Sequence, residues 1–269
     1  DIGSRMLDGY KSEFSKNQNK NINQFSLNFL NLENKLIKGN FDHILVLGWN
    51  NLLYINAILY ALKHKIKLIL RVETNLLLKI NPIKRLIKTI ILKNLFKKIN
   101  YFLAIGILNK NFLLNHNVPR KKIYPGPYFV DNNFFSKKIK KKSKNKKKIV
   151  LFVGKLIQRK NPFEFLNLAQ MFLKNKKIQF IMIGDGILKK ECLKFINKRR
   201  LNNVSLIGFV NQTQLKNYYQ KSDLLIVPSY YETWGLVINE AFASNIPVIC
   251  SENCGASKDL ILNGKTGFT

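Results

Sequence analysis

The sequence predicts an α/β fold made of two doubly wound domains. Short apolar runs rich in Ile, Leu, Val and Phe alternate along the chain with segments of helical periodicity. This alternation occurs twice, once on each side of a lysine-rich run, "KKIKKKSKNKKK" at 137–148. Hydrophobic residues make up 46% of the 269 residues, which is enough for two cores. Strands that alternate with helices form parallel sheets with helices on both faces.

The first predicted domain covers residues 1–135 and is expected to be incomplete at its start. Its strand-like runs and helical segments follow one another in this order: strand 41–49, helix 51–65, strand 66–73, a basic helical stretch 81–100, strand 101–106 and a helix that ends before "NVP". Because we expect strands to be missing from this sheet, "ILVLGW" (44–49) should form a poorly covered edge.

A solvated basic linker is predicted at 136–148, because the segment has no apolar periodicity and too much like charge to pack. The second domain, 149–269, repeats the strand–helix rhythm and is expected to be incomplete at its end. Its predicted strands are 149–154, 178–184, 204–210, 224–229 and 246–250, with helical segments between them. Asn161 and Pro162 are typical of a helix start. Doubly wound domains bind ligands at the carboxyl ends of their strands.

The formal net charge of +31 has two explanations. A basic surface attracts nucleic acid or acidic membranes, but an excess of Lys together with Asn and Ile is also what an A/T-biased genome would produce. Aromatic residues are not interleaved with the lysine-rich run, and no nucleic-acid reader fold is evident. We therefore expect no nucleic-acid partner. The three cysteines fit neither a disulfide framework nor a zinc site, so reduced thiols and no metal are expected.

Two predicted strand ends carry groups that suit a diphosphate. After Gly154 the chain places Lys155, Arg159 and Lys160 on a loop that enters a helix, where backbone N–H groups favour an anion. In a lysine-rich chain, these cations could equally be ordinary surface residues. Gly184, in "IGDG", permits close backbone approach at the next strand end.

Two carboxylates stand around a third strand end, in "PSYYETWGLVINEAFASNIPVIC" (228–250). Glu232 lies on the loop, Gly235 permits a tight approach, and Glu240 lies more than one turn inside a helix predicted over 236–244. Each acid alone could be a loop acid near a helix start or a solvent-facing helix acid. Together with the cationic loop they match a sugar nucleotide, which has hydroxyls at both ends and a diphosphate between them.

Five segments of the chain, taken in order, resemble the sugar-donor half of the family 4 retaining glycosyltransferases. They are "FVGKLIQRKNP", "IGDG", "GFV", "PSYYETWGLVINEAFASNIPVI" and "GASKDLILNGKTGF". The resemblance runs from about Lys148 to Thr269, and more weakly through 103–135. It implies the GT-B architecture, with two Rossmann-like domains: an acceptor-side domain at 1–135 and a nucleotide-sugar domain at 149–269. It also implies a sugar donor of the UDP-, GDP- or ADP-sugar type and no metal or other cofactor.

The resemblance assigns roles by position. Lys155, where the family more often has Arg, and Lys160 would contact the diphosphate; Glu232 would bind the transferred sugar and Glu240 the ribose. The backbone from Thr233 through Trp234 and Gly235 to Leu236 would approach the sugar and phosphates, and Gly154, Arg159 and Gly184 would complete the site. Many members have a His on the acceptor side, where this chain has "LILRVETN" (68–75). Glu73 is the candidate to take the role of that His, and the sequence leaves open whether it does.

The resemblance implies transfer of a sugar with retention, in cell-surface polysaccharide, lipopolysaccharide or glycolipid synthesis. A sugar-nucleotide epimerase of the same architecture and a basic nucleic-acid-binding protein are the alternatives. No apolar run is long enough to span a membrane. Within 83–98, Ile and Leu recur at helical spacing beside a basic flank, which fits either a core helix or a helix on an anionic membrane. We expect a cytoplasmic protein, with peripheral contact at the inner membrane face as the second hypothesis.

Overall fold

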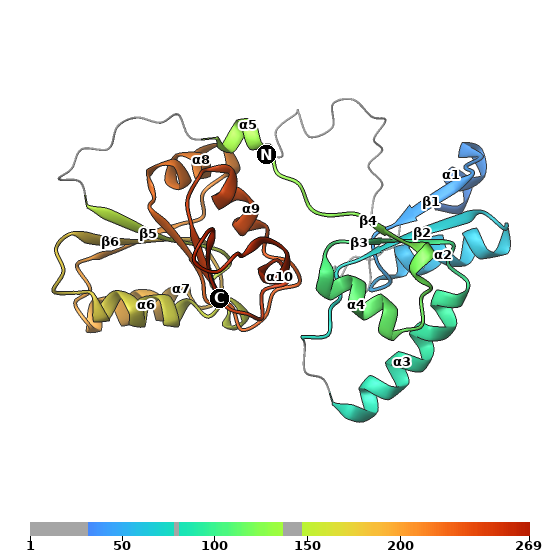
Figure 1. Ribbon diagram of the computed structural model, residues 1–269, viewed down its shortest axis with the longest axis horizontal. Coiled ribbons are helices and arrows are strands. Elements are labelled where there is room, and N and C mark those ends of the chain that lie inside the picture. Colours follow the sequence, from blue (N-terminus) through green and yellow to red (C-terminus); the bar gives the residue numbers. More distant parts are fainter. Residues whose placement is uncertain (1–31, 78–80, 137–146) are drawn as a thin grey trace. The chain divides into compact units, whose positions relative to one another are not determined.

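The computed structural model describes residues 32–77, 81–136 and 147–269, so most of the predicted linker lies outside the described residues. Packing divides the chain into two compact units (Figure 1). The first extends to Val72 and adds Lys88–Leu103 and His116–Tyr124; the second comprises Glu73–Ile87, Ala104–Asn115 and Pro125–Thr269. The units follow from packing alone, and the domain boundaries at 135 and 149 stay a prediction.

The first sheet has the strand order β1-β2-β3-β4. Its strands are β1 (His43–Val46), β2 (Lys67–Val72), β3 (Tyr101–Ala104) and β4 (Ile123–Pro125). β1 and β2 are parallel, with His43 opposite Lys67. The helices in this part of the chain are α1 (Leu32–Gly39), α2 (Leu52–Lys63), α3 (Pro82–Lys97) and α4 (Ile107–Asn115). Within the described residues β1 is the edge strand of this sheet, and Leu45 and Leu47 are about half exposed, so the predicted edge near 44–49 is confirmed for that part of the chain.

The second sheet has six strands in the order β10-β9-β8-β5-β6-β7, and every pairing is parallel. The strands are β5 (Lys148–Val153), β6 (Ile178–Ile183), β7 (Val204–Gly208), β8 (Leu224–Val227), β9 (Val248–Cys250) and β10 (Gly267–Phe268). Counted from β5, this is the order 3-2-1-4-5-6 of a dinucleotide-binding fold. The strand order therefore reverses between β5 and β8.

Helices cover both faces of this sheet (Figure 1). They are α5 (Asn132–Phe135), α6 (Pro162–Met171), α7 (Lys189–Lys198), α8 (Gln212–Lys221), α9 (Leu236–Ala243) and α10 (Ser257–Leu260). β5 shows why two cores form: Val150 and Phe152 pack with residues of α6 and α7, whereas Leu151 between them packs with residues of α5, α8 and α9. Alternate residues of a strand point to opposite faces. The predicted doubly wound α/β fold is confirmed.

Local signals place the helix starts near the site. Pro162 is the first residue of α6, as predicted, because its fixed φ suits the first helical position. Asn161 precedes it in the left-handed conformation, with φ 51°, and its side chain makes no capping hydrogen bond. α9 begins at Leu236 after Gly235, whose φ of 103° favours glycine. The helix predicted over 236–244 is thus observed to within one residue.

Candidate functional site

The candidate site lies at the carboxyl ends of β5 and β8, the two neighbouring strands between which the strand order reverses. A doubly wound sheet binds ligands at this position, because the loops from the two strands diverge there. The loop after β5 carries Lys155, which is exposed, and a 3-10 turn, Gln158–Lys160. The loop after β8 carries Ser229 and Glu232. The Tyr230 N–H donates to the Arg159 carbonyl at 2.9 Å, which joins the two loops.

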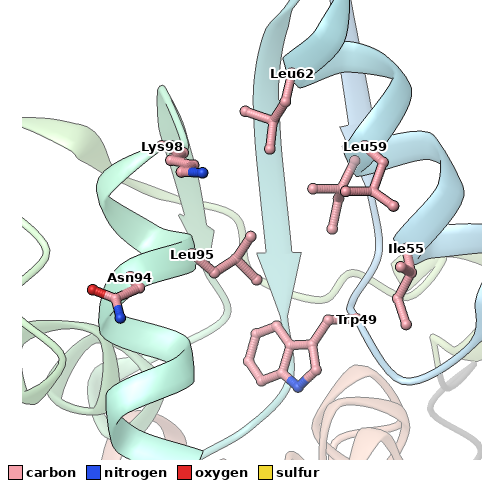
Figure 2. A pocket seen from close by; sticks show the side chains of 8 residues that line it. Trp49, Ile55, Leu59, Leu62, Asn94, Leu95 and Lys98 are labelled. Atoms are coloured by element: carbon pink, nitrogen blue, oxygen red, sulfur yellow. The ribbon is translucent and has the colours of Figure 1, made fainter.

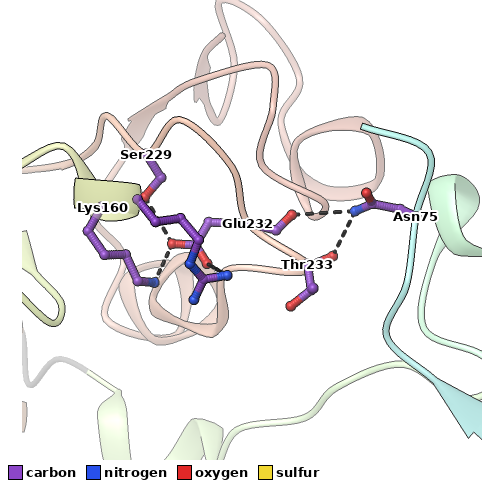
Figure 3. Close-up of polar contacts among 6 residues, drawn as sticks. Asn75, Lys160, Ser229, Glu232 and Thr233 are labelled. Carbon is purple, nitrogen blue, oxygen red and sulfur yellow. Dashed lines mark hydrogen bonds and ion pairs between the residues drawn. The ribbon is translucent and has the colours of Figure 1, made fainter. Parts of the chain in front are cut away.

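Glu232 is the most heavily partnered side chain of the site (Figure 3). Only 4% of the residue is exposed. Its Oε1 accepts from the Lys160 ammonium and from the Ser229 hydroxyl, the latter at 2.9 Å. Its Oε2 lies 4.0 Å from the guanidinium of Arg159, which is exposed. A buried carboxylate is stable only when it is paired and hydrogen-bonded, so these three residues supply the partners that fix the position of Glu232 at the strand end.

Glu240 is buried on α9, with 7% of the residue exposed, rather than facing solvent. Its Oε2 accepts a hydrogen bond of 2.7 Å from the Tyr219 hydroxyl of α8. Burial raises the pKa of Glu240, and the hydrogen bond from Tyr219 opposes that rise. Burial, followed by the charge of Glu240, raises the pKa of Tyr219 well above its usual value, so the hydroxyl keeps its proton and remains the donor.

Glycines bring backbone close to the site. Gly184 has a φ of +147°, and a Cβ there would lie 1.8 Å from the Gly154 carbonyl oxygen, so the turns after β5 and β6 pack backbone against backbone. Gly235 immediately precedes α9, so the N–H groups of the first helical turn start at Leu236. The Trp234 side chain is buried and donates to Asn239 Oδ1 at 2.8 Å, so it is held inside the second unit.

Three residues of this region were not predicted. Tyr219 holds Glu240, as described above. Asn75 is buried, and its amide donates to the carbonyls of Glu232 (3.4 Å) and Thr233 (3.3 Å) (Figure 3). The pKa of Tyr231 is raised chiefly by burial, while Arg159 lowers it and Glu232 and Glu73 raise it further. A local sequence pattern could not have identified Tyr219 or Asn75, since each meets its partner through the tertiary fold.

Glu73, the acceptor-side candidate, is exposed, and its charge reaches Tyr231. Residues 32–77, 81–136 and 147–269 contain no group of three or more His, Cys, Asp or Glu side chains that could hold a metal ion. All three cysteines are buried free thiols. No helix in this part of the chain is both long and apolar enough to cross a bilayer.

The fold is that of the GT-B glycosyltransferases. The crystal structure of the Anabaena protein HepE in complex with UDP and glucose superposes with a TM-score of 0.67 at 18% sequence identity, over 87% of this chain and 66% of that chain. At this identity the similarity establishes the fold alone.

Sequence comparisons identify the family. The family model described as "Glycosyl transferases group 1" matches residues 134–269, half of the chain, so the chain belongs to the group 1 glycosyl transferases. It is 30% identical over 122 residues to the alpha-D-kanosaminyltransferase of Streptomyces kanamyceticus, which covers 45% of this chain and 31% of that protein. Over 126 residues it is 31% identical to the Escherichia coli UDP-Gal:alpha-D-GlcNAc-diphosphoundecaprenol alpha-1,3-galactosyltransferase, covering 45% of this chain and 32% of that protein. The chain spans about a third of the length of these relatives.

Proposed function

We propose that this chain provides the sugar-donor site of a retaining glycosyltransferase that takes a UDP-, GDP- or ADP-sugar and needs no metal ion. The observation that carries the proposal is the buried Glu232, held by Lys160 and Ser229 and approached by Arg159 at the switch point of the sheet. The family assignment of residues 134–269 supports it, and favours transfer over an epimerase or a nucleic-acid-binding protein.

In the proposed complex, the diphosphate lies between the loop after β5 and the first turn of α9. As the bond between the sugar C1 and the diphosphate oxygen breaks, negative charge grows on the diphosphate. Lys155, Arg159 and Lys160 would stabilise that charge together with the N-terminal end of α9, which begins at Leu236. Positive charge is then already present where the leaving group develops its negative charge, which is why no metal ion is proposed.

The two carboxylates have different proposed partners. Glu232 accepts from the sugar hydroxyls, since it lies on the loop after β8 beside the cations. Glu240 accepts from the ribose hydroxyls through Oε1, because Tyr219 occupies Oε2 and no described residue donates to the other oxygen. A carboxylate with one oxygen fixed by the protein is oriented before the ligand arrives, and this lowers the entropic cost of binding.

For the acceptor we propose a glycan or a lipid-linked glycan, with Glu73 on the acceptor side and the product in cell-surface polysaccharide, lipopolysaccharide or glycolipid. One supporting fact is that the matching Escherichia coli protein is named for a diphosphoundecaprenol-linked acceptor. Retention means that the acceptor oxygen bonds to C1 on the face that the diphosphate leaves, while the acceptor hydroxyl passes its proton to the oxygen of the departing diphosphate. No protein nucleophile is assigned.

The test is product analysis of the full-length protein. It is incubated with a panel of UDP-, GDP- and ADP-sugars and candidate acceptors, with and without EDTA, and the products are identified by mass spectrometry and NMR. We expect a transferred sugar with the anomeric configuration of the donor and equal yield in EDTA. Conversion of the sugar nucleotide into its epimer, an inverted product, or activity abolished by EDTA would each contradict part of the proposal.

A further inference from the structure

An apolar strip runs along the outside of α3. Ile83, Ile87 and Ile91 are spaced four residues apart, and Ile90 lies beside them, so the four fall within roughly 100° of the helix circumference. Their residues are 53–70% exposed. The buried residues of this helix, Leu92 and Phe96, lie on the opposite side. The apolar residues at helical spacing are therefore mainly on the outer face of α3, which is not the pattern of a core helix.

Lysines flank this strip on both sides. Lys84 and Lys88 follow Ile83 and Ile87 by one position, which places them along one edge, whereas Lys93 and Lys97 project along the other edge. The sixteen residues of α3 contain no Asp or Glu. An apolar centre between two rows of cations is the arrangement of a helix that lies in a membrane interface, with its aliphatic side chains among acyl chains and its cations at the headgroups.

The strip leads to an apolar pocket in the first unit (Figure 2). Leu95, one turn beyond Ile91, forms part of its wall, and Leu59 of α2 lies opposite. The pocket has a volume of about 240 Å³ and is lined by Trp49, Ile55, Ile58, Leu59, Leu62, Asn94, Leu95 and Lys98. Six of these eight side chains are aliphatic or aromatic, and Lys98 adds a cation. Leu59 is 58% exposed, so the apolar surface extends from α3 onto α2.

We propose that the outer face of α3, continued by this pocket, docks on the surface of an anionic membrane. A chain of net charge +31 is attracted to any anionic surface, and a bilayer with anionic lipids offers both hydrocarbon and negative headgroups to a strip of this composition. This proposal does not depend on the proposed sugar transfer, because it concerns vesicle binding in the absence of substrates.

The test is sedimentation of the full-length protein with vesicles. We expect binding to phosphatidylcholine vesicles that contain phosphatidylglycerol, much weaker binding to pure phosphatidylcholine, and loss of binding at high salt. Each lysine at the surface is worth on the order of a fivefold change in partitioning, so replacing Lys84, Lys88 and Lys93 together by Gln should weaken binding about a hundredfold. The matched control replaces the exposed Lys174, Lys176 and Lys177 by Gln, which removes the same charge elsewhere.

The apolar contribution needs its own variants. Ile87→Ser with Ile90→Ser should weaken binding by roughly tenfold or more, since the side chains no longer enter the acyl region. Met171→Ser with Ile187→Ser is the control, because these residues are 80% and 79% exposed in the second unit. Equal losses in both lysine variants would attribute binding to net charge alone. Such equal losses would overturn the proposal. It would also be overturned by equal binding to neutral vesicles, by an isoleucine variant that binds normally, or by no binding at all.

Discussion

The hydrogen bond from Tyr219 to Glu240 should contribute to stability in a way that depends on pH. Tyr219→Phe keeps the buried ring and its edge-on contact with Phe135 at 5.8 Å, and removes only the hydroxyl that donates to Glu240 at 2.7 Å. A hydrogen bond to a charged group contributes about 1.5–3 kcal/mol, and one to a neutral group about 0.5–1.5 kcal/mol. The loss of stability should therefore be larger when Glu240 is ionised.

The direction follows from the pKa of Glu240. Burial raises this pKa above its usual 4.5, so between the two values the folded protein binds more protons than the unfolded chain, and this group's contribution to stability falls as pH rises. The Tyr219 hydrogen bond lowers the pKa, so its removal extends the unfavourable window to higher pH. The difference in the free energy of unfolding between the unsubstituted protein and Tyr219→Phe should thus increase from pH 5 to pH 8.

Urea unfolding at both pH values measures this difference. A Trp49→Phe background lets the fluorescence of Trp234, which lies in the core of the second unit, report on that unit. Tyr218→Phe is the control, on the same helix and packed against the same core. We expect Tyr219→Phe to cost about 1.5–3 kcal/mol at pH 8 and less at pH 5. An equal cost at both pH values, or the same pattern in the control, would refute the assignment.

Three further predictions concern the site and its supports. Glu240→Ala should weaken binding of the free nucleoside diphosphate by about ten- to a hundredfold, whereas Glu232→Ala should leave that binding unchanged and weaken binding of the intact sugar donor. Calorimetric titration measures both affinities, and equal effects of the two substitutions on nucleoside diphosphate binding would contradict the separate roles. Gly184→Ala should destabilise the second unit far more than Gly264→Ala in urea unfolding, since both have positive φ but nothing lies within 4 Å of a Cβ at Gly264; similar losses would show that the close approach is not limiting. Burial raises the pKa of the Cys192 thiol to about 11, so this thiol should react with a disulfide reagent at pH 8 only after unfolding, and rapid labelling of the native protein would contradict its burial.

Much of the second unit follows from its sequence. Apolar runs of four to six residues between helical segments predict the strands, and Pro162 marks a helix start, because these signals act within a few residues. The loops that carry Lys160 and Glu232 could be placed at strand ends for the same reason. That they meet at one point depends on the strand order, which brings β5 beside β8, and no local pattern contains this information.

The environments of the two carboxylates were harder to predict from the sequence. Considered alone, Glu240 in the sequence resembles a solvent-facing helix acid, yet it is buried because α8 packs beside α9 and supplies Tyr219. Asn75 fastens the backbone of Glu232 and Thr233 from more than 150 residues away in the chain. The short elements α5 and β4 were missed, since three or four residues carry too little periodicity. In α3 the spacing was evident, but which face is exposed became clear only from the packing of Leu92 and Phe96.

The central claim, that a nucleoside diphosphate binds at the switch point between β5 and β8, is tested most directly by hydrogen–deuterium exchange of the full-length protein. Exchange is measured with saturating UDP, GDP or ADP in EDTA, and with pyrophosphate as the control for attraction to the basic surface. The account predicts that at least one nucleotide slows exchange in peptides covering 154–160 and 229–240, beyond any effect of pyrophosphate. Protection elsewhere in the chain, or no protection by any of the three nucleotides, would contradict it.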